Sequence, residues 1–240
     1  MHRVSMRKDT SIPKNNQNQK TMAKINNGHF GSYQGKLGAV TGRKMRGQFY
    51  IHQSITHNSS NTVPQQKVRA KFKCLSHFCG QFERLFKTTM VKARRGQETP
   101  YNAGARLNWQ AVKPAQQDPS TGEWTAVMDP EKLLFSAGNY EPVKGLVYDE
   151  NTSTTLKFSW DDAIGEGSAL DFVNILVYCP KYEEYIIVYR DSSVIRSESE
   201  CSITIPTSWM SQDLYGYGWA ESPEGRKIGE TQFLGVIEPD

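Results

Sequence analysis

The first half of this 240-residue chain is nearly devoid of acidic residues, and the whole chain has few cysteines and no long apolar run. Its mean hydropathy is -0.62, and no stretch approaches the roughly 20 consecutive apolar residues of a membrane-spanning helix, so no membrane partner is expected. Residues 1–21 lack the apolar core of about 7 to 15 residues of a secretory signal, which argues against export by that route. The four cysteines are too few for a disulfide scaffold, and we expect small buried thiols in a reducing compartment.

Catalytic motifs are missing as well. The chain contains neither a G-x-S-x-G nucleophile elbow nor an H-E-x-x-H zinc motif. A phosphate-binding loop is matched only loosely, because three residues instead of four separate Gly31 from Gly35, and Leu37 stands where Ser or Thr is needed. We therefore expect a protein that is not an enzyme and has no cofactor.

Three groups of side chains have some potential to bind a ligand. The metal candidate is a Cys-x-x-His-x-Cys segment: Cys74, His77 and Cys79. On a helix its two cysteines lie about 140° apart, which disfavours zinc. The second group is an acidic loop: Asp161, Asp162, Glu166 and Asp171. It lacks calcium-loop spacing and is more typical of a solvated loop. The third is a run of alternating aromatic residues: Tyr215, Tyr217 and Trp219. Such rings form sugar platforms in some proteins, but core or interface positions are commoner.

Charge divides the chain into two halves. Residues 1–113 carry 21 Lys or Arg against three acidic residues, a net charge of +18, whereas residues 114–240 carry 8 basic and 22 acidic residues, a net charge of −14. This asymmetry indicates two structural units with different surroundings, and a basic half that meets a polyanion or an acidic protein surface. Alternatively, the two halves neutralise each other, within one chain or between neighbours in an assembly.

A glycine-rich stretch lies in the basic half. Its six glycines are closely spaced: Gly28, Gly31, Gly35, Gly38, Gly42 and Gly47. This density favours turns and close backbone approaches over helix, and we predict a β-arc or hairpin with strands near 36–40 and 48–55. Residues 1–21 contain no apolar cluster and are predicted to form a flexible basic arm.

Residues 64–95 have the clearest helical pattern. Apolar residues recur at steps of three and four: Val68, Phe72, Leu75, Cys79, Phe82 and Phe86. The remaining face is basic: Lys67, Arg69, Lys71, Lys73, Arg84, Lys87, Lys92, Arg94 and Arg95. We predict one amphipathic helix, followed by a shorter helix over 101–112 that packs back on it. The basic face suits nucleic acid, an anionic membrane or an acidic protein ring, and an ordinary solvated face is the alternative.

The sequence pattern of the acidic half predicts a β-sandwich. The turn cluster DPSTGE at 118–123 marks the boundary. Strands with alternating apolar residues are predicted over six segments: 155–161, 172–179, 185–190, 200–206, 214–221 and 231–237. Residues 133–136 and 146–148 are candidates for further strands. The predicted fold class is α+β: a flexible arm (1–21), a basic Gly-rich β and helical assembly domain (22–117) and an immunoglobulin- or fibronectin-like sandwich (118–240).

Several segments, taken together and in order, resemble a known family. They are MAKINNG (22–28), GKLGAVTG (35–42), RGQFYI (46–51), QQKVRAKF (65–72), YNAGARLNWQAV (101–112), KLLFSAG (132–138), LKFSWDD, NILVYCP, ITIPTSW (203–209) and FLGVI (233–237). The chain is similar over about residues 22–237 to an uncharacterised family of Bacteroidota and their phages, known as domain of unknown function 6266. The family has no established catalytic residues to transfer. Its association with phages of gut Bacteroidota, including crAss-like ones, implies a virion component assembled in the bacterial cytoplasm.

Three functional hypotheses follow. The first is a non-enzymatic structural protein that forms a ring, about 12-fold for a phage neck or tail component, and contacts copies of itself, other ring or portal proteins, and DNA in the lumen. The second is a DNA-associated architectural protein, and the third is a surface or glycan-binding adhesion module. In the first two, the interface is formed by one basic set: Lys36, Arg43, Lys44, Arg46, Lys67, Arg69, Lys71, Lys73, Lys92, Arg94 and Arg95.

Overall fold

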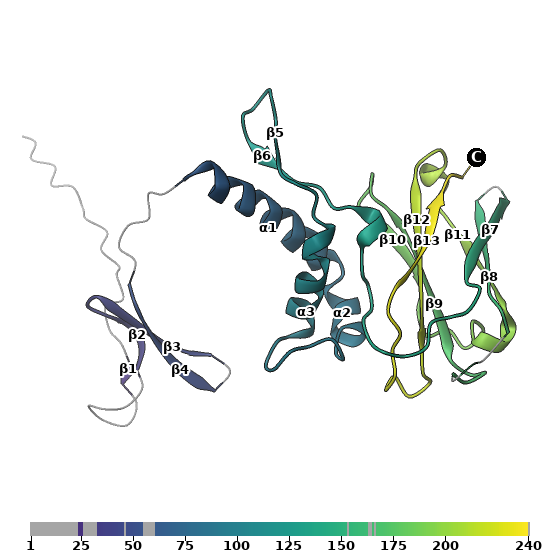
Figure 1. Cartoon of the computed structure of the whole chain (residues 1–240), viewed down its shortest axis with the longest axis horizontal. Coiled ribbons are helices and arrows are strands. Elements are labelled where there is room, and N and C mark those ends of the chain that lie inside the picture. Colours follow the sequence, from purple (N-terminus) through teal and green to yellow (C-terminus); the bar gives the residue numbers. More distant parts are fainter. Residues whose placement is uncertain are drawn as a thin grey trace, which may run out of the picture. The chain divides into compact units, whose positions relative to one another are not determined.

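The computed structural model describes residues 24–25, 33–45, 47–54, 61–152, 154–162, 165 and 167–239. The predicted arm (1–21), Arg46 and Glu166 lie outside the described residues. The chain divides into two compact units, residues 1–60 and 61–240, which are treated separately below (Figure 1). The helical segment therefore belongs to the same unit as the sandwich that follows it. Within the described residues, no helix is long and apolar enough to cross a membrane.

The first unit contains a small antiparallel sheet. Its strands run in the order β1 (Lys24–Ile25), β2 (Tyr33–Leu37), β3 (Val40–Met45) and β4 (Gln48–Gln53). The predicted strand over 36–40 is divided, because Gly38 has a φ of +57° and opens the two-residue turn between β2 and β3. The second predicted strand agrees with β4 to within two residues at its end.

The second unit begins with three helices instead of the two predicted. They are α1 (Val63–Gln81), α2 (Glu83–Thr89) and α3 (Pro100–Leu107), which continues as a 3₁₀ turn over Asn108–Ala111. The single helix predicted over 64–95 is wrong, because the backbone leaves helical geometry at Phe82 and α2 stops at Thr89. The Thr89 hydroxyl bonds back to the Leu85 carbonyl at 3.0 Å and also reaches the Phe135 carbonyl at 2.6 Å.

Seven strands form the predicted sandwich. They are β7 (Val147–Thr152), β8 (Thr155–Ser159), β9 (Phe172–Cys179), β10 (Glu184–Val188), β11 (Glu200–Thr204), β12 (Leu214–Glu221) and β13 (Gln232–Ile237). One sheet has the order β10-β9-β12-β13 and the other has the order β11-β8-β7, with every pair antiparallel. Their inner faces share one core, to which β8 contributes Leu156 and Phe158 and β9 contributes Ile175 and Val177.

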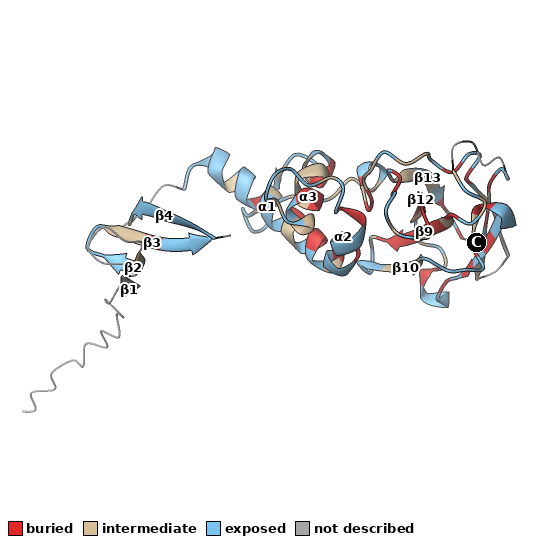
Figure 2. Ribbon diagram, turned by 90° about the horizontal axis from the view of Figure 1, so that it is seen from below, coloured by how far each residue is buried: buried red, intermediate tan, exposed pale blue. Residues whose placement is uncertain are grey.

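The outer face of the four-stranded sheet is covered by the helices. Phe78 and Phe82 pack on Tyr178, and Phe86 packs on Phe82, in a second core that also contains Tyr217 and is separate from the one between the sheets. The second unit therefore has three layers, helices on sheet on sheet, which agrees with an α+β class. Figure 2 shows the buried residues in these layers, whereas strands β2 to β4 are exposed or intermediate along almost their whole length.

The segment that connects the helices to the sandwich differs from the sequence-based prediction. Residues 113–129 form a hairpin with short strands β5 (Gln116–Gln117) and β6 (Trp124–Thr125). Residues 133–136, predicted as a strand, form none, because side chains satisfy the backbone N–H groups there. Leu134 N donates to Asn108 Oδ1 at 2.8 Å, and Phe135 N donates to Thr231 Oγ1 at 2.9 Å.

Candidate functional site

The sheet of the first unit has two chemically different faces. Residues opposite each other in an antiparallel pair share a face, so the register assigns one face to apolar side chains: Tyr33, Leu37, Val40, Phe49 and Ile51. We call this the apolar sheet face. It is uncovered within the described part of the first unit, because Leu37 and Ile51 are 50% and 63% exposed and Gly42 is the only buried residue there.

The predicted basic residues of this sheet separate onto the two faces. Lys36 and Arg43 lie on the polar face, beside Thr41 and Tyr50 respectively. Lys44 lies on the apolar sheet face, with its Nζ 5.1 Å from the centre of the Phe49 ring. A cation on an aromatic ring keeps its charge while it covers apolar surface. Arg46 is outside the described residues.

A glycine under an aromatic ring shapes the apolar sheet face. A Cβ added at Gly42 would clash with the Tyr33 carbonyl oxygen and lie 2.8 Å from the Tyr33 ring, closer than real Cβ atoms approach. The Tyr33 ring therefore lies directly over the Gly42 backbone, and the glycine is needed because any side chain would displace it. This explains one glycine of the predicted cluster by packing instead of by a turn.

The basic residues predicted to share one helix face lie in separate parts of the structure, among them α1 and the segment after α2. On α1, Lys67 lies over Trp124 at 4.6 Å and Lys71 over Trp109 at 4.8 Å, so two of its bases pack against the hairpin and the 3₁₀ turn. Arg69 donates to Asn61 Oδ1 at 2.9 Å, and Lys73 borders a groove. Three further bases follow the end of α2 and are not on a helix: Lys92, Arg94 and Arg95. A continuous basic stripe is not formed.

The apolar stripe of α1 is only partly covered. Leu75 and Cys79 are buried among the helices, as predicted, but Val68 and Phe72 are 55% and 61% exposed. All four lie on one side of the helix, at steps of four, three and four. Within the described residues, the N-terminal half of the stripe is therefore open.

A groove of about 510 Å³ lies between α1, the chain around β6 and the turn after β9. Its polar end holds His77, whose Nε2 is 2.9 Å from Glu183 Oε2. Cys74 also lines the groove, and burial together with the Glu183 carboxylate raises the pKa of its thiol. A raised pKa keeps this thiol protonated and therefore a poor nucleophile. These three residues do not form an activated cysteine site.

Within the described part of the chain, neither the metal candidate nor the calcium candidate is assembled. Cys79 is buried in the helical core, whereas Cys74 and His77 line the groove. Asp171 is buried and binds Arg196 instead, with 3.2 Å between Asp171 Oδ2 and Arg196 Nε. Among the described residues, no group of three His, Cys, Asp or Glu side chains is placed to hold a metal ion.

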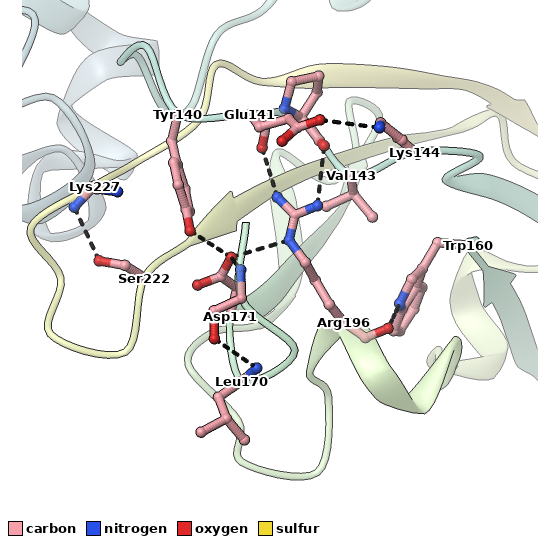
Figure 3. A network of polar contacts seen from close by, with 12 residues as sticks. Tyr140, Glu141, Val143, Lys144, Trp160, Leu170, Asp171, Arg196, Ser222 and Lys227 are labelled. Atoms are coloured by element: carbon pink, nitrogen blue, oxygen red, sulfur yellow. Dashed lines mark hydrogen bonds and ion pairs between the residues drawn. The ribbon is translucent and has the colours of Figure 1, made fainter. Parts of the chain in front are cut away.

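Asp171 and Arg196 belong to a buried polar network (Figure 3). Tyr140 Oη donates to Asp171 Oδ2 at 2.7 Å, and the Arg196 guanidinium donates to the Glu141 carbonyl at 2.7 Å. Burial and the hydrogen bond to Asp171 raise the pKa of Tyr140 to about 12. The Trp160 indole N–H donates to the Arg196 carbonyl at 2.9 Å. The network ties three loops together, which is a structural role.

The predicted aromatic platform is internal. Tyr217 and Trp219 are fully buried under the helical layer, and Tyr217 Oη donates to the Pro130 carbonyl at 2.6 Å. The core interpretation of these rings is therefore confirmed. Only Tyr215 is partly exposed, where it stacks with Phe233 of β13 at 6.4 Å between ring centres.

Phe233 is a surface residue that sequence reasoning did not single out, and so is Val236. They are three residues apart, and in a regular strand they would face opposite ways. A β-bulge in β13 opposite Gly216 and Tyr217 shifts the register, so that Phe233 pairs with Tyr217 and Val236 pairs with Tyr215. Both therefore lie on the face that the helices cover elsewhere. The sequence signal for this bulge is Gly235, because an isolated glycine inside a strand pattern suggests a bulge.

Comparison with known proteins gives one assignment. The model described as "Family of unknown function (DUF6266)" matches residues 32–235, most of the chain, and the chain therefore belongs to this family. The resemblance expected from the sequence motifs is confirmed. None of the curated proteins matches the chain. Among solved structures, the fibronectin type III domain of the human collagen alpha-1(XX) chain is similar at 17% identity and a TM-score of 0.30, over 43% of this chain and 88% of that chain.

Proposed function

We propose that this member of the DUF6266 family is a non-enzymatic structural protein that assembles with copies of itself into a ring or barrel, as a neck or tail component of a phage virion. The virion setting comes from the family resemblance. The assembly role is supported by the surfaces of the chain itself, and one observation carries it.

That observation is the uncovered apolar sheet face. A small sheet needs a hydrophobic face covered by another element to be stable in water. In the described part of the first unit only Gly42 is buried, and Leu37, Phe49 and Ile51 are all exposed. A sheet with these properties is typical of an element that completes its core against a partner surface. Monomeric enzymes and carriers have little use for such an element.

The distribution of charge along the chain favours a partner with an acidic surface. Residues 10–82 contain no Asp or Glu, so no acidic side chain of that segment neutralises Lys36, Arg43 or Lys44. The acidic sandwich of another copy is a complementary surface, because residues 114–240 carry the net charge of −14. Opposite charges at the two ends of a chain favour head-to-tail contacts, which close into rings when the rotation permits.

The sandwich fits a presenting or spacing role in this assembly. We assign its strands, in chain order, as A, B, C, C′, E, F and G. The sheets then read C′-C-F-G and E-B-A. This arrangement differs from an immunoglobulin constant domain in that the fourth strand pairs with C instead of with E. We therefore group the sandwich with the fibronectin-like members of this architecture.

The test is the mass of the untagged, nuclease-treated protein at about 50 and about 500 mM salt, a range over which exposed charge contacts become strongly screened. Multi-angle light scattering coupled to gel filtration measures it. We expect a discrete high-order species, free of nucleic acid, that weakens at high salt. A protein that stays at 27.2 kDa under both conditions up to high concentration contradicts self-assembly.

A second candidate, a DNA-associated architectural protein, is favoured by the separate bases after α2. Lys92, Arg94 and Arg95 are exposed. The Arg94 side chain donates a hydrogen bond from Nε to the nearby Val91 carbonyl at 3.2 Å. Clustered bases at a surface suit phosphate contacts, whose affinity falls steeply with salt. Replacing the three by glutamine should abolish retention of duplex DNA at low salt. Unchanged retention removes this candidate.

A further inference from the structure

Within the described residues, two apolar surfaces of this chain are uncovered, and they carry opposite charges at their borders. The first is the apolar sheet face, which includes Lys44. The second lies at the edge of the four-stranded sheet and consists of Tyr215, Phe233 and Val236. We call it the β13 patch. Phe233 is 38% and Val236 43% exposed, although both sit on the sheet face that the helices bury at Tyr217.

The border of the β13 patch is acidic. Glu131 belongs to the 3₁₀ turn Pro130–Lys132, which contacts β13, and Asp213 directly precedes β12. Both are exposed, and no ion pair of either is formed within the described residues. Burial, followed by the carboxylates of Asp213, Glu131 and Asp129, raises the pKa of Tyr215. The negative charges therefore lie close enough to the patch to act on it electrostatically.

The patch is also sterically open. β13 is an edge strand of its sheet, and its bulge at Gly235, with a φ of +109°, interrupts the regular ladder. A bulged edge resists extension by another strand. A partner therefore meets this region through side chains on the sheet face instead of through backbone pairing. That requirement suits a second sheet laid face to face, at the usual spacing of about 10 Å.

We propose that the apolar sheet face of one copy docks on the β13 patch of the next copy, with Lys44 beside the Glu131 and Asp213 carboxylates. This inference rests on the proposed function and names the contact that builds the assembly. The contact is heterologous, because the two surfaces come from different units of the chain. Every copy can therefore act once as donor and once as acceptor, which is the rule for a cyclic ring.

The size of the contact argues for a ring over a dimer. Three strands of five or six residues present a face of roughly 15 by 20 Å, or about 300 Å². A stable two-body interface buries about 800 Å² per partner. One such contact is therefore weak by itself, and closure, which makes two contacts per copy, gives the stable species. An isologous pairing of two apolar sheet faces would also place Lys44 of both copies in one small interface, which is unfavourable.

The experiment uses one donor variant and one acceptor variant of the full chain. The donor variant is Ile51→Asp, and its matched control is Tyr50→Asp on the polar face of the same strand. The acceptor variant is Val236→Asp, and its control is Val147→Asp, a valine of the other sheet that is 48% exposed against 43% for Val236. Sedimentation velocity measures the mass of each, first alone and then in equimolar mixtures.

The expected result is specific to a head-to-tail contact. Ile51→Asp and Val236→Asp alone remain monomers, whereas both controls assemble like the wild type. Mixed together, the two defective variants associate through their one intact pair of surfaces and stop at the dimer, twice 27.2 kDa. Because a single contact is weak, this dimer forms only at high concentration.

Other outcomes overturn the inference in distinguishable ways. If Ile51→Asp is monomeric and Val236→Asp assembles normally, the sheet docks elsewhere, on itself or on another partner, and the proposed assembly role survives. If both defective variants assemble like the wild type, the contact is also wrong while self-assembly stands. A wild type that is monomeric throughout removes the inference together with the proposed function.

Discussion

Replacing Arg196 by methionine tests whether the buried polar network holds the second unit together. Arg196 and Asp171 are 1% and 0% exposed, with 3.2 Å between Arg196 Nε and Asp171 Oδ2. Methionine fills much of the space but leaves the Asp171 charge buried without its counter-ion. Breaking a buried pair in this way costs about 3–5 kcal/mol. Tyr140 Oη and the Ser168 N–H still donate to the carboxylate, so we expect the lower end, about 3 kcal/mol.

Urea unfolding measures this cost in the second unit alone. All five tryptophans lie within residues 61–240, so tryptophan fluorescence does not report on the first unit. With an m-value of about 2 kcal/mol/M, the expected loss lowers the urea midpoint by about 1.5 M. The double variant Arg196→Met, Asp171→Asn should recover about half of it, because the uncompensated charge is gone.

The matched control is Lys87→Met, which removes an ion pair at the surface. Lys87 and Glu83 are 2.9 Å apart, but both side chains are more than half exposed. An exposed helical pair of this kind contributes about 0.3–0.5 kcal/mol. An Arg196→Met variant that loses less than about 1 kcal/mol, or no more than Lys87→Met, would refute the reasoning that burial makes the network important.

Three further predictions concern packing, pH and thiol access. Gly104→Ala should destabilise the second unit by about 1–3 kcal/mol, because the added Cβ would lie 2.7 Å from the Phe86 ring. Gly80→Ala, in open space on α1, should stabilise it by about 0.5–1 kcal/mol, and thermal unfolding compares the two. The Arg106 side chain, hydrogen-bonded to Glu98, lowers the pKa of that carboxyl below its ordinary 4.5. The stability advantage of the wild type over Glu98→Gln should therefore be complete above pH 4.5 and disappear as the pH falls through the lowered value, and an advantage that persists at pH 2 contradicts this sign. Burial raises the pKa of Cys79 to about 12, so native thiol labelling at pH 8 should modify the partly exposed Cys74 first, and equal rates for the two would be unexpected.

Local periodicity determined which faces of the chain are apolar. The step of three and four residues identified the helical stripe, and four of its six members are buried: Leu75, Cys79, Phe82 and Phe86. Apolar patterning identified six of the seven sandwich strands. β8 and β11 alternate because only one of their faces is buried, whereas β9 and β12 are buried on both faces and are apolar along most of their length. The charge division could also be read directly, since it needs only residue identities.

Only the tertiary structure decided where these patterns stop and what covers them. The predicted helix breaks at Phe82 and stops at Thr89, whose hydroxyl donates to the Phe135 carbonyl, 46 residues away. Residues 133–136 look like a strand but bond to the Asn108 and Thr231 side chains. The sequence placed Asp171 in a solvated loop, whereas in the structure it is paired with Arg196. These outcomes depend on partners far apart in sequence, which propensity does not encode.

The candidate interaction surfaces show the same division. The sequence by itself determined that Leu37, Phe49 and Ile51 are apolar residues in a basic segment without Asp or Glu. The strand register decided that they share one face, and the absence of a covering element in the described first unit left that face open. The β13 patch exists only because a bulge turns Phe233 and Val236 to the same side. Residue types set the chemistry of a surface, whereas pairing and packing determine which side chains lie together and remain exposed.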